Sequence, residues 1–65
     1  MKVQYFQDTD TLYVEFRGDE ITQTRDLDEN TVLDLNALGD VCALTLEHAS
    51  KRADLGHLIV EGIAA

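Results

Sequence analysis

The chain has 65 residues, which is enough for one small domain. It has 13 acidic and five basic residues, and the formal net charge of −8 predicts repulsion from nucleic acid and from anionic membranes. The single cysteine excludes an intrachain disulfide framework, and with only two histidines beside it the chain has no zinc-binding pattern.

Alternating apolar and polar residues predict strands along the first part of the chain. The clearest candidate covers 11–17, where Leu12, Val14 and Phe16 share one face. The other candidates cover 2–7, 21–27, 31–36 and 41–47. Short segments rich in Asp, Asn and Gly separate them and are typical of turns. We therefore predict an antiparallel β-meander of about five strands.

Residues 48–65 have a different pattern. Ser50 is a suitable N-cap, so we predict a C-terminal helix that begins there and is interrupted near Gly56. The predicted fold class is α+β, in one domain made of the meander (1–47) and this helical or mixed segment. A further strand over 57–63 is the alternative, since consecutive apolar residues also suit a strand. The apolar residues at helical spacing are Leu55, Leu58, Ile59 and Ile63.

Two acidic stretches resemble chemical motifs. Asp8 and Asp10 have the spacing of a phosphotransfer nucleophile loop, but a chain this short lacks the other residues that would hold Mg²⁺ and phosphate. A hairpin turn is the better interpretation. Asp26, Asp28 and Asn30 match the first half of a calcium loop, but the Gly and Glu that complete it are missing. We expect no bound metal and no cofactor.

Other reactive residues lack visible partners. Cys42 lies on the apolar side of a predicted strand, as a small buried residue would. His48 lies beside Glu47, Ser50 and Lys51 in an apparent acid/base cluster, but a helix cap already explains the serine. A hydrolase that uses His48 and Asp34 is a further hypothesis. His57 is interpreted as a surface or partly buried residue rather than a ligand. We therefore predict no catalytic residue and a protein that is not an enzyme.

The leading hypothesis is a domain that acts by protein–protein contact. A domain this small is marginally stable alone, so we expect a homo-oligomer that uses an uncovered sheet face or the C-terminal segment. The acidic charge also favours a small basic protein as a partner. The alternative is a small-molecule binding module, with the ligand between subunits near Tyr13, Arg17 and Asp34, because Tyr and Arg could stack on or pair with an anion.

Location is predicted from what the chain lacks. No apolar run approaches the roughly 20 residues that span a membrane. The polar residues that follow Met1 to Val3 do not resemble the core of a signal peptide. With its lone cysteine, the chain is predicted to be cytoplasmic and to have no membrane contact.

The stretches DTDTLYVEF and VLDLNALGDVCALTLEHASKR resemble a small bacterial family, domain of unknown function 2283. The chain departs from the family pattern at Thr45, where a Glu is usual, and at His48, where Asp or Asn is usual. The resemblance covers about 1–52 and implies a compact β-rich domain with no established enzyme activity. Some members are encoded beside toxin-like proteins, which implies an antitoxin-like role. The matching positions are Leu12, Tyr13, Asp34, Gly39 and 49–52.

Overall fold

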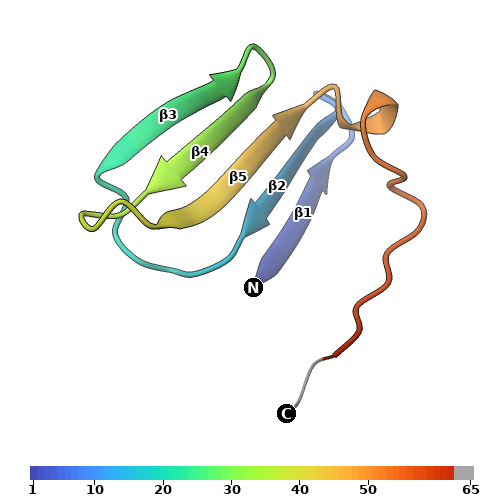
Figure 1. The fold of residues 1–65 in the computed structure, drawn as a ribbon. Coiled ribbons are helices and arrows are strands. Elements are labelled where there is room, and N and C mark those ends of the chain that lie inside the picture. Colours follow the sequence, from blue (N-terminus) through green and yellow to red (C-terminus); the bar gives the residue numbers. More distant parts are fainter. Residues whose placement is uncertain (63–65) are drawn as a thin grey trace.

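A computed structural model of the protein describes residues 1–62. Five antiparallel strands form a single sheet in the order β1-β2-β5-β4-β3 (Figure 1). The strands are β1 (Lys2–Phe6), β2 (Thr11–Glu15), β3 (Gln23–Asp28), β4 (Thr31–Leu35) and β5 (Val41–Glu47). Each lies where the alternation of the sequence predicted a strand.

The strand order is not that of a simple meander, because β5 lies between β2 and β4. Residues 16–22 therefore carry the chain from the end of β2 to β3 at the far edge (Figure 1). The central place suits β5, since Cys42 and Ala43 on its opposite faces are 0% and 1% exposed. The edge suits β3, whose residues are all exposed and which contains a bulge at Leu27.

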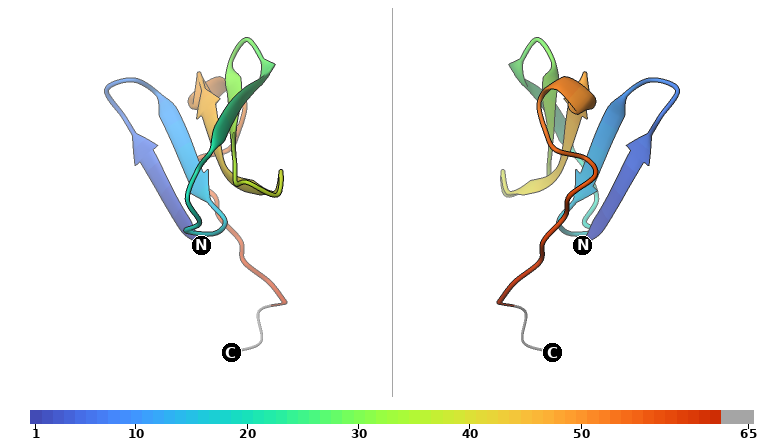
Figure 2. Two further views of the ribbon diagram at one scale, coloured as in Figure 1. Left: turned by 90° about the vertical axis from the view of Figure 1, so that its left-hand side faces the viewer. Right: turned by 90° about the vertical axis from the view of Figure 1, so that its right-hand side faces the viewer.

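The predicted C-terminal helix is wrong, and so is the α+β class. Residues 1–62 contain no α-helix; β5 is followed only by a 3₁₀ turn, η1 (Ala49–Lys51). Ser50 bonds to the β1–β2 turn instead of capping a helix. The chain then runs past β1 without regular structure (Figures 1 and 2), and the alternative strand is absent from 57–62.

Ile63, the last residue of the predicted helical stripe, lies outside the described residues. Within the described part, no helix is long and apolar enough to cross a membrane.

The strand register separates the side chains of the sheet into two faces. One row runs across the sheet through Val3, Val14, Leu44 and Leu33, and the next row contains Tyr5, Leu12 and Leu46. These side chains form what we call the apolar face. The opposite, polar face carries Gln4, Tyr13, Glu15, Val32, Asp34 and Thr45.

The sheet is a single twisted layer (Figure 2). Only four apolar residues of the described chain are fully buried: Leu35, Cys42, Ala43 and Ala49. The core of one chain is therefore thin, and most of the apolar face lies outside it.

Candidate functional site

The apolar face is the most unusual surface of this molecule. Val3 and Tyr5 are 47% and 42% exposed, and Phe16, which follows β2, is 43% exposed. The central residues, such as Val14 and Leu44, are only half-buried. Large contiguous apolar surfaces of this kind are uncommon on monomers and mark sites of contact with other molecules.

A groove of about 460 Å³ lies at one margin of this face. Its floor comes from β1 and β2, through Val3, Tyr5 and Leu12, and its wall comes from the segment 53–58. The wall is mainly apolar, but it includes the Asp54 carboxylate and the His57 ring. The groove therefore suits an apolar group with a polar or cationic neighbour.

The chain continues from this wall as an exposed apolar run. Leu58, Ile59 and Val60 are 72%, 64% and 62% exposed. Leu58 also lines the groove, so the run and the apolar face adjoin.

Asp10 has a structural task at the end of the sheet near η1. Its Oδ1 accepts hydrogen bonds from the Tyr5 hydroxyl at 2.6 Å and from the Ser50 amide at 3.0 Å, and its Oδ2 accepts one from the Ser50 hydroxyl at 2.7 Å. These bonds, first that from Tyr5 and then those from Ser50, lower the pKa of Asp10. The same contact raises the pKa of Tyr5. Asp10 thus fastens the β1–β2 turn to η1, as part of a turn rather than a nucleophile loop.

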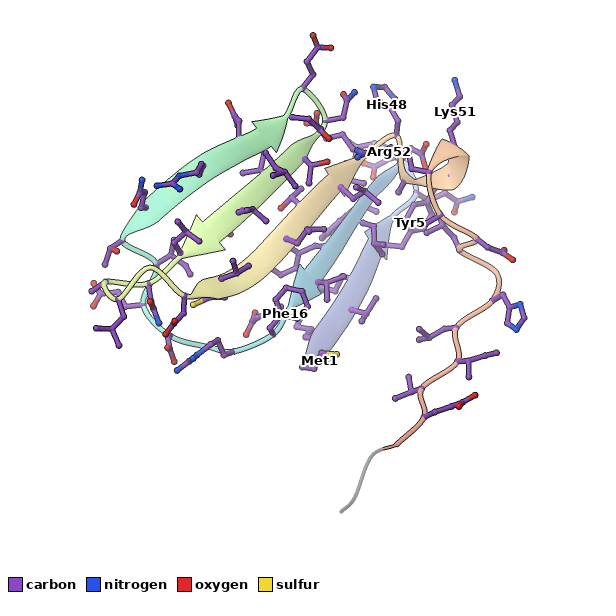
Figure 3. All side chains as sticks on the ribbon, viewed as in Figure 1. Met1, Tyr5, Phe16, His48, Lys51 and Arg52 are labelled. Carbon is purple, nitrogen blue, oxygen red and sulfur yellow. The ribbon has the colours of Figure 1, made fainter. Side chains whose placement is uncertain are left out.

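Arg52 makes a second fastening at the same end of the sheet, directly after η1 (Figure 3). Its guanidinium donates to the carbonyl oxygens of Asn30 at 2.7 Å and Glu47 at 3.2 Å. It also donates to the Thr31 hydroxyl at 2.6 Å. The β3–β4 turn, the end of β5 and η1 are therefore held by one side chain.

The acidic turn that resembles a calcium loop contacts Arg52 through Asp28. The Asp28 carboxylate accepts the Asn30 amide at 2.8 Å and lies 3.5 Å from the Arg52 guanidinium. The Asn30 amide first, then Thr31 and the positive charge of Arg52, lower the pKa of Asp28. Asp26 lies on β3 opposite Val32. Within residues 1–62 no three His, Cys, Asp or Glu side chains gather as metal ligands would.

The structure brings together two of the three residues proposed to contact a ligand or partner. Tyr13 on β2 and Asp34 on β4 lie on the polar face, on either side of β5. Burial first, and then the charges of Glu15 and Asp34, raise the pKa of Tyr13. Arg17 is instead engaged in ion pairs with Asp19 at 2.8 Å and with Asp40 at 3.6 Å. An anion at Tyr13 would therefore meet carboxylates rather than a guanidinium.

Asn36 is a structural residue that the sequence interpretation missed. It is 8% exposed, and its amide group donates to Asp19 at 3.0 Å and to Asp40 at 3.3 Å. Its Oδ1 accepts the backbone amides of Leu38 at 3.0 Å and Asp40 at 2.9 Å. Together with Arg17, Asn36 links residues 16–22, which connect β2 to β3, to the β4–β5 turn. The available signal was an Asn three residues before a Gly, a pattern typical of such turns.

The residues of the hydrolase hypothesis have separate partners. The Ser50 hydroxyl donates to Asp10, and Asp34 accepts a hydrogen bond from Thr24 at 3.2 Å. His48 takes a left-handed backbone conformation, φ 54°, at the junction of β5 and η1. Cys42 is fully buried, with its thiol 3.6 Å from the Asp40 carbonyl oxygen.

Comparison with known proteins gives one match. The profile of a protein family described as "Protein of unknown function (DUF2283)" matches residues 2–50. No curated protein and no solved structure matches the chain. Because the match covers most of the chain, the protein belongs to this family of unknown function, DUF2283, as its sequence pattern predicted.

Proposed function

We propose that this domain acts by protein–protein contact and that the apolar face is its contact surface. The observation that carries the proposal is a sheet face of large apolar side chains that the described chain covers only in part: its margin, Val3, Tyr5 and Phe16, is more than 40% exposed, and its centre is half-buried. The proposed occupant is a polypeptide that presents apolar side chains, because burying apolar area is the main source of free energy in protein association.

The breadth of the surface favours a polypeptide. The apolar side chains come from β1, β2, β5 and β4, so the surface extends across neighbouring strands of the sheet. Patches of this extent are typical of protein contacts, whereas a small molecule needs a concave site.

The role is proposed to be non-enzymatic. The side chains that could assist a reaction have structural partners: Ser50 bonds Asp10, and Arg17 pairs with Asp19. Cys42 is fully buried. A catalytic group needs a reacting partner within hydrogen-bond reach in an accessible place, and none of these residues offers one.

Two valines provide a matched test. Val14 lies on the apolar face and Val32 on the polar face, and both are half-buried strand residues. We would replace each in turn by an aliphatic residue that carries a diazirine and irradiate the full chain in host cell extract. We expect polypeptide adducts, of this chain or of another, from the Val14 position and few from the Val32 position. Equal yields, or no polypeptide adduct from either position, would refute the proposal.

A second function is favoured by the groove alone. Its volume of about 460 Å³ lies in the range of small-molecule sites, roughly 300–1,000 Å³. The ligand would lie over Leu12 and beside Asp54, and not at Tyr13. A ligand there would raise the unfolding temperature, and Leu12→Ala would reduce that rise while Val32→Ala would not. In the crosslinking experiment this alternative predicts a small-molecule adduct in place of a polypeptide.

A further inference from the structure

We infer that the polypeptide on the apolar face is a second copy of this chain, and that two apolar faces pack together as the layers of a β-sandwich. The inference rests on the proposed function and names the partner of the same surface. Three observations carry it: the surface area of one chain, the missing second layer and the distribution of charge.

The surface area of one chain is too large for a compact monomer. The chain exposes 5022 Å², whereas a compact monomer of 7.3 kDa exposes about 4,200 Å². The excess is about 850 Å², and it comes both from the sheet and from the extended run from Leu58 to Val60. A standard protein–protein interface removes about 800 Å² from each partner. One interface of ordinary size would therefore bring the exposed area per chain to that of a compact protein.

One chain also supplies only half of a usual core. Stable domains pack at least two layers of secondary structure around their apolar side chains. Here the molecule measures only 17 Å along its shortest axis, and no helix or second sheet of residues 1–62 covers the apolar face. A second sheet about 10 Å away would bury Val14, Leu33, Leu44 and Leu46 from the other side.

The charge distribution makes this face the place where two acidic chains can meet. Glu15, Asp26, Asp34 and Glu47 all project from the polar face of the sheet. Among the strand rows of the apolar face the ionised side chains are Arg25, opposite Leu33, and Asp28, opposite Thr31, and both lie at the β3 edge.

Two carboxylates lie at the margins of the apolar face, and each already has a neighbour. Asp28 lies beside Arg52, and Asp54 lies 3.9 Å from the His57 ring. Two chains of charge −8 can thus pack here without opposing carboxylates at the centre. Repulsion between the outer faces is screened within about 8 Å at physiological salt.

A two-fold arrangement satisfies these conditions, because it places the same patch on both sides of the interface. The exposed run from Leu58 to Val60 adjoins the face through the groove. The same partner can therefore cover this run as well as the sheet.

The first test is the mass of the purified full chain, measured by light scattering and by sedimentation across a wide range of dilution. We expect twice the mass of one chain. Leu44→Glu places a carboxylate at the centre of the face, between Val14 and Leu33, and should raise the dissociation constant of the dimer roughly 30-fold or more. Thr45→Glu is the matched control, since Thr45 is the next residue and lies on the polar face; it should leave the dimer intact.

A second measurement on the unchanged chain keeps the test decisive if Leu44→Glu does not fold. In a mixture of isotope-labelled and unlabelled chains, nuclear Overhauser effects should join Leu12, Val14 and Leu33 methyl groups of different copies. A monomer at every concentration, or a dimer whose intermolecular contacts come from the polar face, would overturn the inference. If the chain is a monomer but the Val14 position still crosslinks to another protein, the proposed function stands and only the second copy is excluded.

Discussion

Replacing Arg52 by alanine should destabilise the fold more than any change at a neighbouring exposed residue. The guanidinium donates three hydrogen bonds, to two backbone carbonyl groups and to Thr31. The strands that it joins, β4 and β5, are neighbours in the sheet, but η1 is attached to them chiefly through this side chain and Asp10. Without it the end of the sheet loses one of its two fastenings.

The magnitude follows from burial and charge. Hydrogen bonds from a charged donor contribute about 1.5–3 kcal/mol each, but the Arg52 side chain is 31% exposed, so water replaces part of that contribution. Thr31 is 3% exposed, and its hydroxyl would be left without this donor. We expect a total loss of about 2–3 kcal/mol. A domain of 65 residues has about 3–10 kcal/mol in all, so the unfolding temperature should fall by about 10–20 °C.

The assay is urea unfolding followed by circular dichroism at one fixed protein concentration, because self-association would couple to stability. Lys51→Ala is the control: Lys51 is the adjacent cation, is exposed and has no ion pair within residues 1–62, so its loss should change stability by less than about 0.5 kcal/mol. Arg52→Lys should lie between the two, because an ammonium group cannot reproduce the planar fork. If Arg52→Ala and Lys51→Ala unfold at the same urea concentration, the bonding role derived for Arg52 is refuted.

Three further outcomes are expected. The Tyr5 hydroxyl lowers the pKa of Asp10 in the folded chain. The ionised carboxylate therefore stabilises the fold above its unfolded pKa, and this stability is lost as the pH falls below about 4. When unfolding is measured at a series of pH values, Asp10→Asn should reduce the loss of stability in acid. Gly39 has φ +85° and open space where a side chain would stand, so Gly39→Ala should cost about 1 kcal/mol through backbone strain alone. Gly18 has no positive φ, so Gly18→Ala should be neutral or stabilising by about 0.5 kcal/mol. Cys42 is fully buried, so a thiol reagent should label it at the rate of unfolding, and fast labelling of the folded chain would contradict this packing.

The strands could be predicted from the sequence because a half-buried strand alternates with period two. Leu12, Val14 and Phe16 showed that period. The order of the strands could not be predicted in the same way. The central place of β5 depends on Cys42 and Ala43 being buried on opposite faces, and a small cysteine and alanine give no strong periodic signal.

The helix prediction failed for an identifiable reason. The spacing of Leu55, Leu58 and Ile59 does fit a helix stripe, but such a stripe stabilises a helix only when it packs on something. After Arg52 the chain runs past β1 as the wall of the groove, where Leu55 is only half-buried and Leu58 and Ile59 stay exposed, so the stripe finds little to pack on. Gly56 adds the entropic cost of glycine. The hydroxyl of Ser50, the predicted cap, donates a hydrogen bond to Asp10, which lies 40 positions earlier in the chain. Contacts at that separation leave no trace in local periodicity.

The two sequence pieces that resemble the family pattern, DTDTLYVEF and the stretch that ends at Arg52, meet in space, and the family profile itself covers them as far as Ser50. Asp10 belongs to the first piece, and Ser50 and Arg52 belong to the last; their side chains fasten the two hairpin turns to η1. This explains why the motif resembles a chemical site without being one, because acids, a serine and an arginine also supply the hydrogen bonds that hold turns in place.

The two kinds of residue should therefore respond differently to substitution. A change at Asp10 or Arg52 removes bonds within one chain, so it should lower the free energy of unfolding even where no partner is present. A change at Leu44 removes apolar area from the exposed face, so it should alter association first. Stability measured against protein concentration separates the two effects, since only the second depends on a partner. A Leu44 variant whose loss of stability does not depend on concentration would place the apolar face in the core of one chain and leave it no role in contact with another.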